Sequence, residues 1–425
     1  MQPSPQVSTR YRYTVLLFLA LAYCLNYMDR QVIGILAVPI KADLKLTDSE
    51  LALMGGFAFA IFYSCLGIPV ARLADRMSRI KIISVACLVW SACTASCGLA
   101  NSFGQLLLAR LSVGIGEAGG VAPTYSLLSD YFPPRQRGRA LAVLTLGLPI
   151  GSALGLLLGA IFAENYGWRA AFMLLGAGGI VLAPILFLVV REPPRGQLDA
   201  PTGDGTSQPA PTLGMVVRHL LPLPGFWLIS FASASASMLS YGLQFWLPTY
   251  IYRSHNLSLT TTSYVLSSIT IVGGVIGLLL GGVLCDRLGA RNKGAYGYVP
   301  SIGFVIGMPF MLAAALASGL PATVAFLLLP QVAGVMWMAP AVSSVQHLAP
   351  STMRASASAI FLFIVNLIGL GAGTLAFGGL SDFYQAHFGP EALRYAIITV
   401  VVVLYPLTAV LYALAGRKLA GDWQE

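Results

Sequence analysis

Long apolar runs separated by short polar breaks dominate this chain. Each run holds about 20 mostly apolar residues, the length that crosses the hydrocarbon core of a membrane as an α-helix. Cutting at the charged or Pro/Gly-rich breaks predicts twelve spans, at roughly 13–38, 50–72, 82–100, 104–130, 138–162, 169–190, 225–250, 261–285, 295–317, 320–346, 354–380 and 391–415. We therefore expect an all-α integral membrane protein.

The composition agrees with this class. Of the 425 residues, 57% are hydrophobic and 10% are charged, and the mean hydropathy is +0.77; soluble domains carry about 25% charged residues. The net charge of +9 comes from small groups of Lys and Arg in the breaks, so we expect no nucleic-acid partner. The first run is too long for a signal-peptide core and is expected to be a retained helix. The six cysteines fall in or beside apolar spans, at spacings that suit neither disulfides nor a metal site.

The chain divides into two halves at a segment rich in Pro, Gly, Ser and Thr. Such a composition is typical of a flexible linker. The predicted organisation is a cytoplasmic tail (1–12), a six-helix bundle (13–190), a cytoplasmic linker (191–224), a second six-helix bundle (225–415) and a C-terminal tail (416–425).

The loop charges predict the orientation. Most of the 25 Lys and Arg residues lie on the side of the N-terminus, and few lie in the opposite loops: Lys41, Lys45, Arg169, Arg253 and Arg394. Because Lys and Arg accumulate in cytoplasmic loops, we expect both termini in the cytoplasm and the protein in the cell (inner) membrane.

Two loop motifs and several shorter ones resemble a known family. ARLADRMSRIK (71–81) and GVLCDRLGARNK (282–293) are similar to the G-x-x-x-D-R-x-G-x-R-x-K signature of the major facilitator superfamily, although Ala71 and Ser78 replace its usual glycines. RLSVGIG (110–116), GWRAAF (167–172) and REPPRG (191–196) are also typical of it.

Within that superfamily, NYMDR (26–30), GIGEA (114–118) and SDYFP (129–133) resemble the spinster family and its bacterial relatives. This resemblance implies two pseudo-symmetric six-helix bundles and a secondary active transporter that works by alternating access. Spinster-like proteins are associated with lysophospholipids and sphingosine-1-phosphate, commonly with proton coupling.

Asp29 and Arg30 stand side by side in the first span, where each charge costs roughly 2.5–3.5 kcal/mol on insertion scales. Tyr23, Asn26, Tyr27 and Arg30 follow the i, i+3, i+4, i+7 spacing and form one polar stripe. Asp29 points about 100° away from Arg30, a single helical step. Its side chain is expected either to border the cavity on the Asn26 side or to contact a neighbouring helix.

In the fourth span, Arg110 and Glu117 share a face, and Glu117 and Arg30 are expected at similar depth. In the superfamily fold, spans one and four of each half line the central cavity, so the resemblance implies an Arg30–Glu117 pair, in which each charge offsets the burial of the other. The four histidines lie in loops or at span ends, so the predicted proton site is Glu117, supported by Asp29. Arg30, with Asn26, Tyr27 and Arg110, is predicted to bind an anionic group. A static network that fixes helix packing is the alternative.

The second half contributes an apolar and aromatic lining without a deep carboxylate, which suits an amphipathic anion. Its predicted substrate-contacting residues are Tyr241, Gln244, Phe361 and Asn366. The small residues of FASASAS (231–237) are equally consistent with close helix packing.

The family resemblance also implies a cytoplasmic gate. Asp75 is expected to face Arg354, Asp286 is expected to face Arg139, and Asp130 joins the first cluster. The predicted gate residues are Asp75, Arg76, Arg79, Asp130, Arg139, Asp286, Arg287, Arg291 and Arg354.

Nucleotide-binding and hydrolase motifs are missing: there is no G-x-x-x-x-G-K-[ST], H-E-x-x-H or G-x-S-x-G sequence, which argues against an ATP-driven pump and an enzyme. We predict a proton-coupled carrier of an amphipathic anion such as a lysophospholipid, acting as a monomer with protons as the coupling ion and no cofactor. A carrier of small organic or sugar-acid anions, a multidrug exporter and, less directly, a channel are the alternatives.

Overall fold

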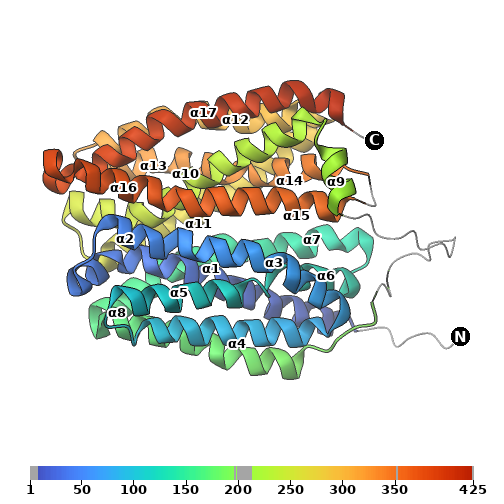
Figure 1. The fold of residues 1–425 in the computed structure, drawn as a ribbon, viewed down its shortest axis with the longest axis horizontal. Helices are drawn as coiled ribbons and strands as arrows, with labels where there is room; N and C mark the ends of the chain where they lie inside the picture. Colours follow the sequence, from blue (N-terminus) through green and yellow to red (C-terminus); the bar gives the residue numbers. More distant parts are fainter. Residues whose placement is uncertain (1–7, 196–197, 199–212, 351–352, 424–425) are drawn as a thin grey trace, which may run out of the picture. The chain divides into compact units, whose positions relative to one another are not determined.

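The computed structural model describes residues 8–195, 198, 213–350 and 353–423, without the side chains of residues 68, 71, 75, 134, 213 and 355. Its elements are helices (Figure 1). The chain divides into two compact units: unit 1 contains Met1–Leu36 and Phe62–Ser207, and unit 2 contains Ala37–Ile61 and Gln208–Glu425.

The first half of the chain forms the helices α1 (Thr9–Leu44), α2 (Asp48–Ala52), the π-helical η1 (Leu53–Phe57), α3 (Ala58–Arg76), α4 (Arg79–Cys97), α5 (Phe103–Glu117), α6 (Val121–Tyr131), α7 (Pro134–Thr145) and α8 (Gly147–Val189).

The second half forms α9 (Leu213–Leu220), α10 (Pro224–His255), α11 (Leu259–Gly289), α12 (Ala295–Leu316), α13 (Leu320–Met336), α14 (Met338–His347), α15 (Arg354–Ile364), the π-helical η2 (Val365–Leu370), α16 (Gly371–Phe388), the 3₁₀-helical η3 (Gly389–Glu391) and α17 (Ala392–Asp422).

The twelve predicted spans are present in this architecture. Eight stretches of the described chain are long and apolar enough to cross a membrane, and two of them, 135–189 and 356–422, have 55 and 67 residues. Because one crossing takes about 20 residues, each of these two contains a pair of spans. They turn at Gly167 (φ +83°) and Gly389 (φ +51°), in the left-handed region that favours glycine. The two remaining spans are the first, formed by α1, and the fourth, formed by α5 and α6.

Each unit begins and ends on one side, as an even number of crossings requires. In unit 1 the Tyr11 hydroxyl, near the start of α1, donates to the Val189 carbonyl at the end of α8. In unit 2 the Gly225 N–H of α10 donates to the Asp422 carboxylate at the end of α17.

Three predicted spans are broken into two helices, which the span prediction did not anticipate. The fourth span breaks between α5 and α6, the fifth between α7 and α8, and the tenth between α13 and α14. Each new helix begins two residues before a proline, namely Pro123, Pro149 and Pro340. Proline lacks the N–H that would continue the helical bonding across the break. The first break leaves Glu117 as the last residue of α5.

Small residues let the helices approach closely. A Cβ on Gly151 of α8 would lie 2.2 Å from the Cys24 carbonyl oxygen of α1, and one on Gly155 would lie 2.5 Å from that of Met28. In unit 2 the serines of FASASAS pack against α17: Ser233 is 3.0 Å from the Tyr412 hydroxyl and Ser235 is 2.6 Å from that of Thr408. These serines are therefore packing residues.

Candidate functional site

Arg30 of α1 and Glu117 of α5 form a buried ion pair inside unit 1. The Arg30 Nε atom lies 2.7 Å from Glu117 Oε2, and the two side chains are 8% and 0% exposed. The predicted contact between the first and fourth spans is therefore present. Removing one partner of such a pair leaves an uncompensated buried charge, which typically costs 3–5 kcal/mol.

Two tyrosine rings flank the Arg30 guanidinium. Its central carbon lies 5.1 Å from the centroid of the Tyr27 ring and 4.6 Å from that of Tyr63. Tyr27 belongs to the predicted polar stripe, whereas the sequence analysis missed Tyr63 of α3, which stands in a strongly apolar run without a charged neighbour. Cation–π contacts of this kind contribute roughly 0.5–2 kcal/mol. The rings hold the guanidinium in one orientation beside Glu117.

Asn26, one turn before Arg30, lies beside Glu117 and is 3% exposed. Neither end of its carboxamide makes a hydrogen bond of good geometry, and the same holds for Oε1 of Glu117. Buried polar groups normally have such partners. The Asn26–Glu117 side of the pair is therefore the less satisfied side of the site.

Asp29 turns away from the pair toward α4, where it lies beside Thr94. Of the two placements that the sequence left open, the structure has the contact with a neighbouring helix. Arg110 is 1% exposed, and its Nη1 donates to the Asp29 carbonyl oxygen over 3.4 Å. Arg110 thus ties α5 to α1 in this conformation, and its role as a substrate ligand stays a prediction.

The residues predicted to contact substrate in the second half lie in unit 2. Phe361 of α15 is 1% exposed and part of the core. Tyr241 and Gln244 of α10 and Asn366 of the π-helical η2 are half-buried. Helix irregularities such as η2 occur frequently at functional sites, so Asn366 remains a reasonable candidate.

At the end of unit 1 where α4 begins, Arg79 joins two acids. Its guanidinium contacts Asp130 of α6 and, through Nε, Glu192, whose oxygen lies 2.7 Å away. Glu192 also accepts hydrogen bonds from Ser78 Oγ and the Ile80 N–H. Burial raises the pKa of the Glu192 carboxyl, but these hydrogen bonds outweigh it and hold the pKa below its ordinary value. The sequence analysis grouped Arg79 with Asp130 but did not assign Glu192.

For the other predicted gate residues, the described part of the structure gives no ion pair between them. The side chain of Asp75 lies outside the described residues. The Arg354 Nε donates to the Ala349 carbonyl oxygen of its own segment. The remaining predicted gate residues are exposed: Arg76, Arg139, Asp286, Arg287 and Arg291. Their gating role stays a prediction.

Unit 2 contains an ionic cluster that the sequence analysis missed, here called the Asp48 cluster: Lys41, Asp48, Arg253, Ser381 and Asp382. The Asp48 carboxylate, 1% exposed, pairs with Lys41 of α1 and lies 3.5 Å from an Arg253 nitrogen of α10. It also accepts the Ser381 hydroxyl proton at 2.7 Å. The Asp382 carboxylate of α16 caps α2, accepting the N–H groups of Asp48 and Ser49 at 3.0 and 2.7 Å.

A sequence signal for this cluster was available. Thr47 and Glu50 form a capping box that marks the start of α2, and Asp48 stands between them. Arg253, Ser381 and Asp382, however, lie more than 200 residues further along the chain. The cluster ties the end of α1 and the start of α2, from the first half of the chain, to α10 and α16 from the second half.

Comparison with known proteins identifies the class. Residues 19–374 match the model of the Major Facilitator Superfamily. The chain belongs to this superfamily, and it is therefore a transporter and not an enzyme.

The individual relatives are consistent with the spinster resemblance. The chain is 33% identical over 411 residues to an MFS-type efflux pump of Mycolicibacterium smegmatis, covering 95% of this chain and 92% of that one. It is 28% identical over 407 residues to protein spinster homolog 1 of Xenopus tropicalis, covering 91% and 76%. A crystal structure of a bacterial homolog of the human lysosomal transporter Spinster, inward-facing and unoccupied, superposes with a TM-score of 0.89 at 30% identity, covering 99% and 100%.

Proposed function

We propose that this transporter couples the movement of an amphipathic anion, with a lysophospholipid as the representative substrate, to the movement of protons. The observation that carries the proposal is the buried Arg30–Glu117 pair, flanked by Tyr27 and Tyr63. Buried pairs contribute little net stability compared with apolar side chains. A pair that exchanges partners during transport gives a reason for keeping both charges.

The coupling follows from competition for Arg30. An anionic headgroup that binds the Arg30 guanidinium displaces the Glu117 carboxylate. Glu117 is fully buried, and a buried carboxylate without a counter-charge binds a proton rather than staying ionised. Substrate binding and proton uptake at Glu117 therefore occur together, and Asp29 serves as a second, supporting proton site. Both symport and antiport are compatible with this exchange.

The Asp48 cluster fits the role of an outer gate. It joins helix ends from the two halves of the chain through a buried carboxylate, two basic side chains and a capped helix N-terminus. Intact contacts in the Asp48 cluster would close the outer end of the transporter. A closed outer end is expected in an inward-facing state, which is the state named for the superposed Spinster homolog. In the alternate state these contacts have to separate.

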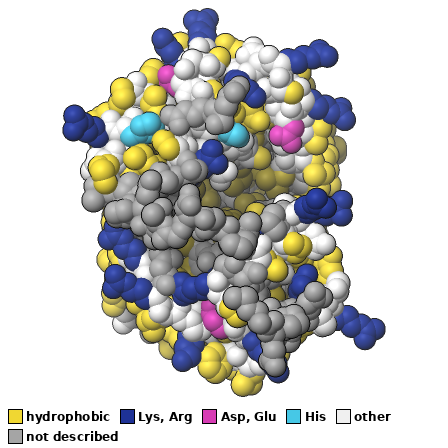
Figure 2. Space-filling view, turned by 90° about the vertical axis from the view of Figure 1, so that its right-hand side faces the viewer, with side chains coloured by type: hydrophobic (Ala, Val, Ile, Leu, Met, Phe, Trp, Pro, Cys, Tyr) yellow, Lys and Arg dark blue, Asp and Glu magenta, His cyan; other side chains and the backbone are white. Residues whose placement is uncertain are grey.

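The orientation rests on charge. Figure 2 shows Lys and Arg side chains gathered around one face, with fewer Asp and Glu side chains. The positive-inside tendency supports a cytoplasmic location for this face, and we propose that both termini lie in the cytoplasm and the protein in the cell (inner) membrane. We further propose that it acts as a monomer, with no cofactor other than protons.

A thermal-shift experiment in lipid nanodiscs tests the substrate class. A lysophospholipid with an anionic headgroup is expected to raise the Tm of the wild type. At a ligand concentration of 100 times Kd, binding adds about 2.7 kcal/mol to the free energy of unfolding. Arg30→Ala should lose this shift. Arg30→Lys should keep only part of it, because an ammonium cannot bind a phosphate bidentately.

Arg218→Ala is the matched control, since Arg218 is an exposed arginine of α9. It should keep the full stabilisation. Stabilisation that persists in Arg30→Ala refutes the assigned anion site. Stabilisation by a small dicarboxylate or hexuronate, but not by the lysophospholipid, refutes the amphipathic substrate and favours a carrier of small organic anions.

A further inference from the structure

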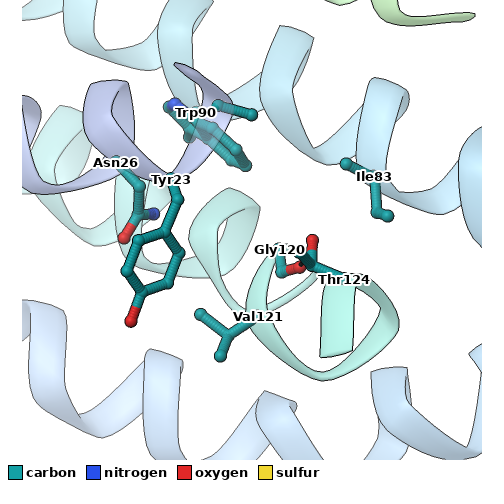
Figure 3. Close-up of a pocket in the computed structure, with 8 residues that line it drawn as sticks. Tyr23, Asn26, Ile83, Trp90, Gly120, Val121 and Thr124 are labelled. Atoms are coloured by element: carbon teal, nitrogen blue, oxygen red, sulfur yellow. Dashed lines mark hydrogen bonds between the residues drawn. The ribbon is translucent and has the colours of Figure 1, made fainter. Parts of the chain in front are cut away.

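A small cavity lies inside unit 1, next to the Glu117 site. Its volume is about 10 Å³, and Figure 3 shows the side chains around it. They come from α1, α4 and the start of α6 with the turn before it, and they are Ala22, Tyr23, Asn26, Ile83, Trp90, Gly120, Val121 and Thr124. A cavity of roughly 10–15 Å³ holds one water molecule, provided that two to four polar groups bind it.

The polar groups that such a water needs are present. Asn26, 3% exposed, has no well-formed hydrogen bond at either end of its carboxamide. In Figure 3 one end of that carboxamide points toward the side where Gly120 and Val121 lie. The Thr124 hydroxyl donates to the Gly120 carbonyl oxygen, which leaves its oxygen able to accept.

We infer that this cavity binds one water molecule between the Asn26 carboxamide and the Thr124 hydroxyl, and that this water supports the ionised form of Glu117 through Asn26. The inference rests on the proposed proton site and extends it. A water both donates and accepts hydrogen bonds, so it satisfies the end of the carboxamide that faces the cavity. The carboxamide nitrogen, which faces the cavity in Figure 3, carries two hydrogens, so it can donate one to the water and the other to Glu117, beside which Asn26 lies. Asn26 is thus a positioning residue for the proton site.

Other groups also act on Glu117 and remain in place in the variants below. Arg30, Arg110 and Asp29 act on Glu117 directly. The titratable groups that surround these three residues and the cavity are Tyr23 and Tyr27 of α1, Tyr63 of α3, Cys87 of α4 and Tyr125 of α6. None of them is altered when the cavity alone is changed.

Two variants are designed to remove the water without altering the Glu117 side chain. Thr124→Val keeps the side-chain shape and loses the hydroxyl. Gly120→Ala adds a methyl group whose nearest neighbours, the Glu117 carbonyl oxygen and Trp90 Cζ3, lie 3.4 Å away, so the methyl fits and takes up cavity space. The matched controls are Thr145→Val, whose hydroxyl likewise bonds its own helix, and Gly178→Ala, which has open space around it.

The role is measured by pH-difference infrared spectroscopy of the Glu117 carboxyl band, identified as the band that Glu117→Gln removes. Losing one hydrogen bond to the ionised form should raise the midpoint by about 0.5–1 pH unit in both cavity variants, and the two controls should titrate like the wild type. An unchanged midpoint in Thr124→Val and Gly120→Ala overturns the inference, even where Glu117→Gln shows that Glu117 is the proton site.

The water site has a separate test. A high-resolution structure of the wild type should show density within hydrogen-bonding distance of both Asn26 and Thr124, and Gly120→Ala should lose it. A dry cavity in the wild type overturns the inference whatever Glu117 does. If water is present but no Glu117 band titrates, the proposed function and the assigned role of the water both fail.

Discussion

Glu117→Gln is the substitution that separates proton coupling from substrate binding. Glutamine has nearly the same shape and keeps an oxygen that can accept from Arg30 Nε, which lies 2.7 Å from the Glu117 oxygen. It cannot take up a proton. Because Arg30 then lacks its counter-ion at 8% exposure, the variant should also be destabilised, by up to about 3 kcal/mol, the lower end of the range for breaking a buried pair.

The expected effect on transport follows from the energy of one proton. A pH difference of one unit supplies about 1.4 kcal/mol per proton, which sustains a tenfold substrate gradient at zero membrane potential. Wild-type protein in proteoliposomes, with the potential clamped by potassium and valinomycin, should therefore build a gradient of about tenfold per coupled proton. Glu117→Gln should bring the substrate only to equal concentrations, while substrate exchange across the membrane continues.

A matched control guards against general damage. Glu391→Gln also breaks a Glu–Arg pair, with Arg394 at the start of α17 in unit 2, and it should retain the gradient. The coupling scheme is refuted if Glu117→Gln, shown to be folded by its thermal transition, still builds a tenfold gradient with the wild-type pH dependence.

Three further substitutions test other parts of the structure. Asp48→Asn should loosen the proposed outer gate and raise the labelling rate of cysteines placed behind it at least about tenfold, since a hydrogen bond to a charged group contributes roughly 1.5–3 kcal/mol; unchanged labelling argues against a gate. Gly151→Ala, whose methyl would meet the Cys24 carbonyl, should lower the unfolding free energy by about 1–3 kcal/mol, whereas Gly178→Ala should not. Glu192→Gln should destabilise by about 1 kcal/mol above pH 5. Because the folded pKa of Glu192 is lowered, its contribution exists above the ordinary value of about 4.3 and is lost as the pH falls through the folded value, where variant and wild type should converge.

Periodicity and depth, combined with the superfamily resemblance, were sufficient to predict the Arg30–Glu117 contact. Asn26, Tyr27 and Arg30 share one helix face, and Glu117 lies at similar depth on another span, so a helix-to-helix contact needed only the superfamily arrangement to bring the faces together. The same reasoning could not place Asp29. A side chain one step away on a helix points toward a different neighbour, and the choice of Thr94 depends on where α4 packs.

The helix breaks show a similar limit. An apolar run predicts that a span exists, because hydrophobicity determines insertion into the membrane. It does not tell whether a proline inside the span merely bends the helix or ends it. In the structure, Pro123 lies just beyond a break that leaves Glu117 at a helix end, beside the cavity lined by Gly120 and Thr124.

The sequence by itself determined the class of protein, the twelve spans and the polar helix face that carries Arg30, because burial energy and helical period act over a few neighbouring residues. Only the tertiary structure decided the Asp48 cluster and the contact of Tyr63 with Arg30. These depend on which helix ends and faces meet, and that is set by packing between segments that lie far apart in the chain.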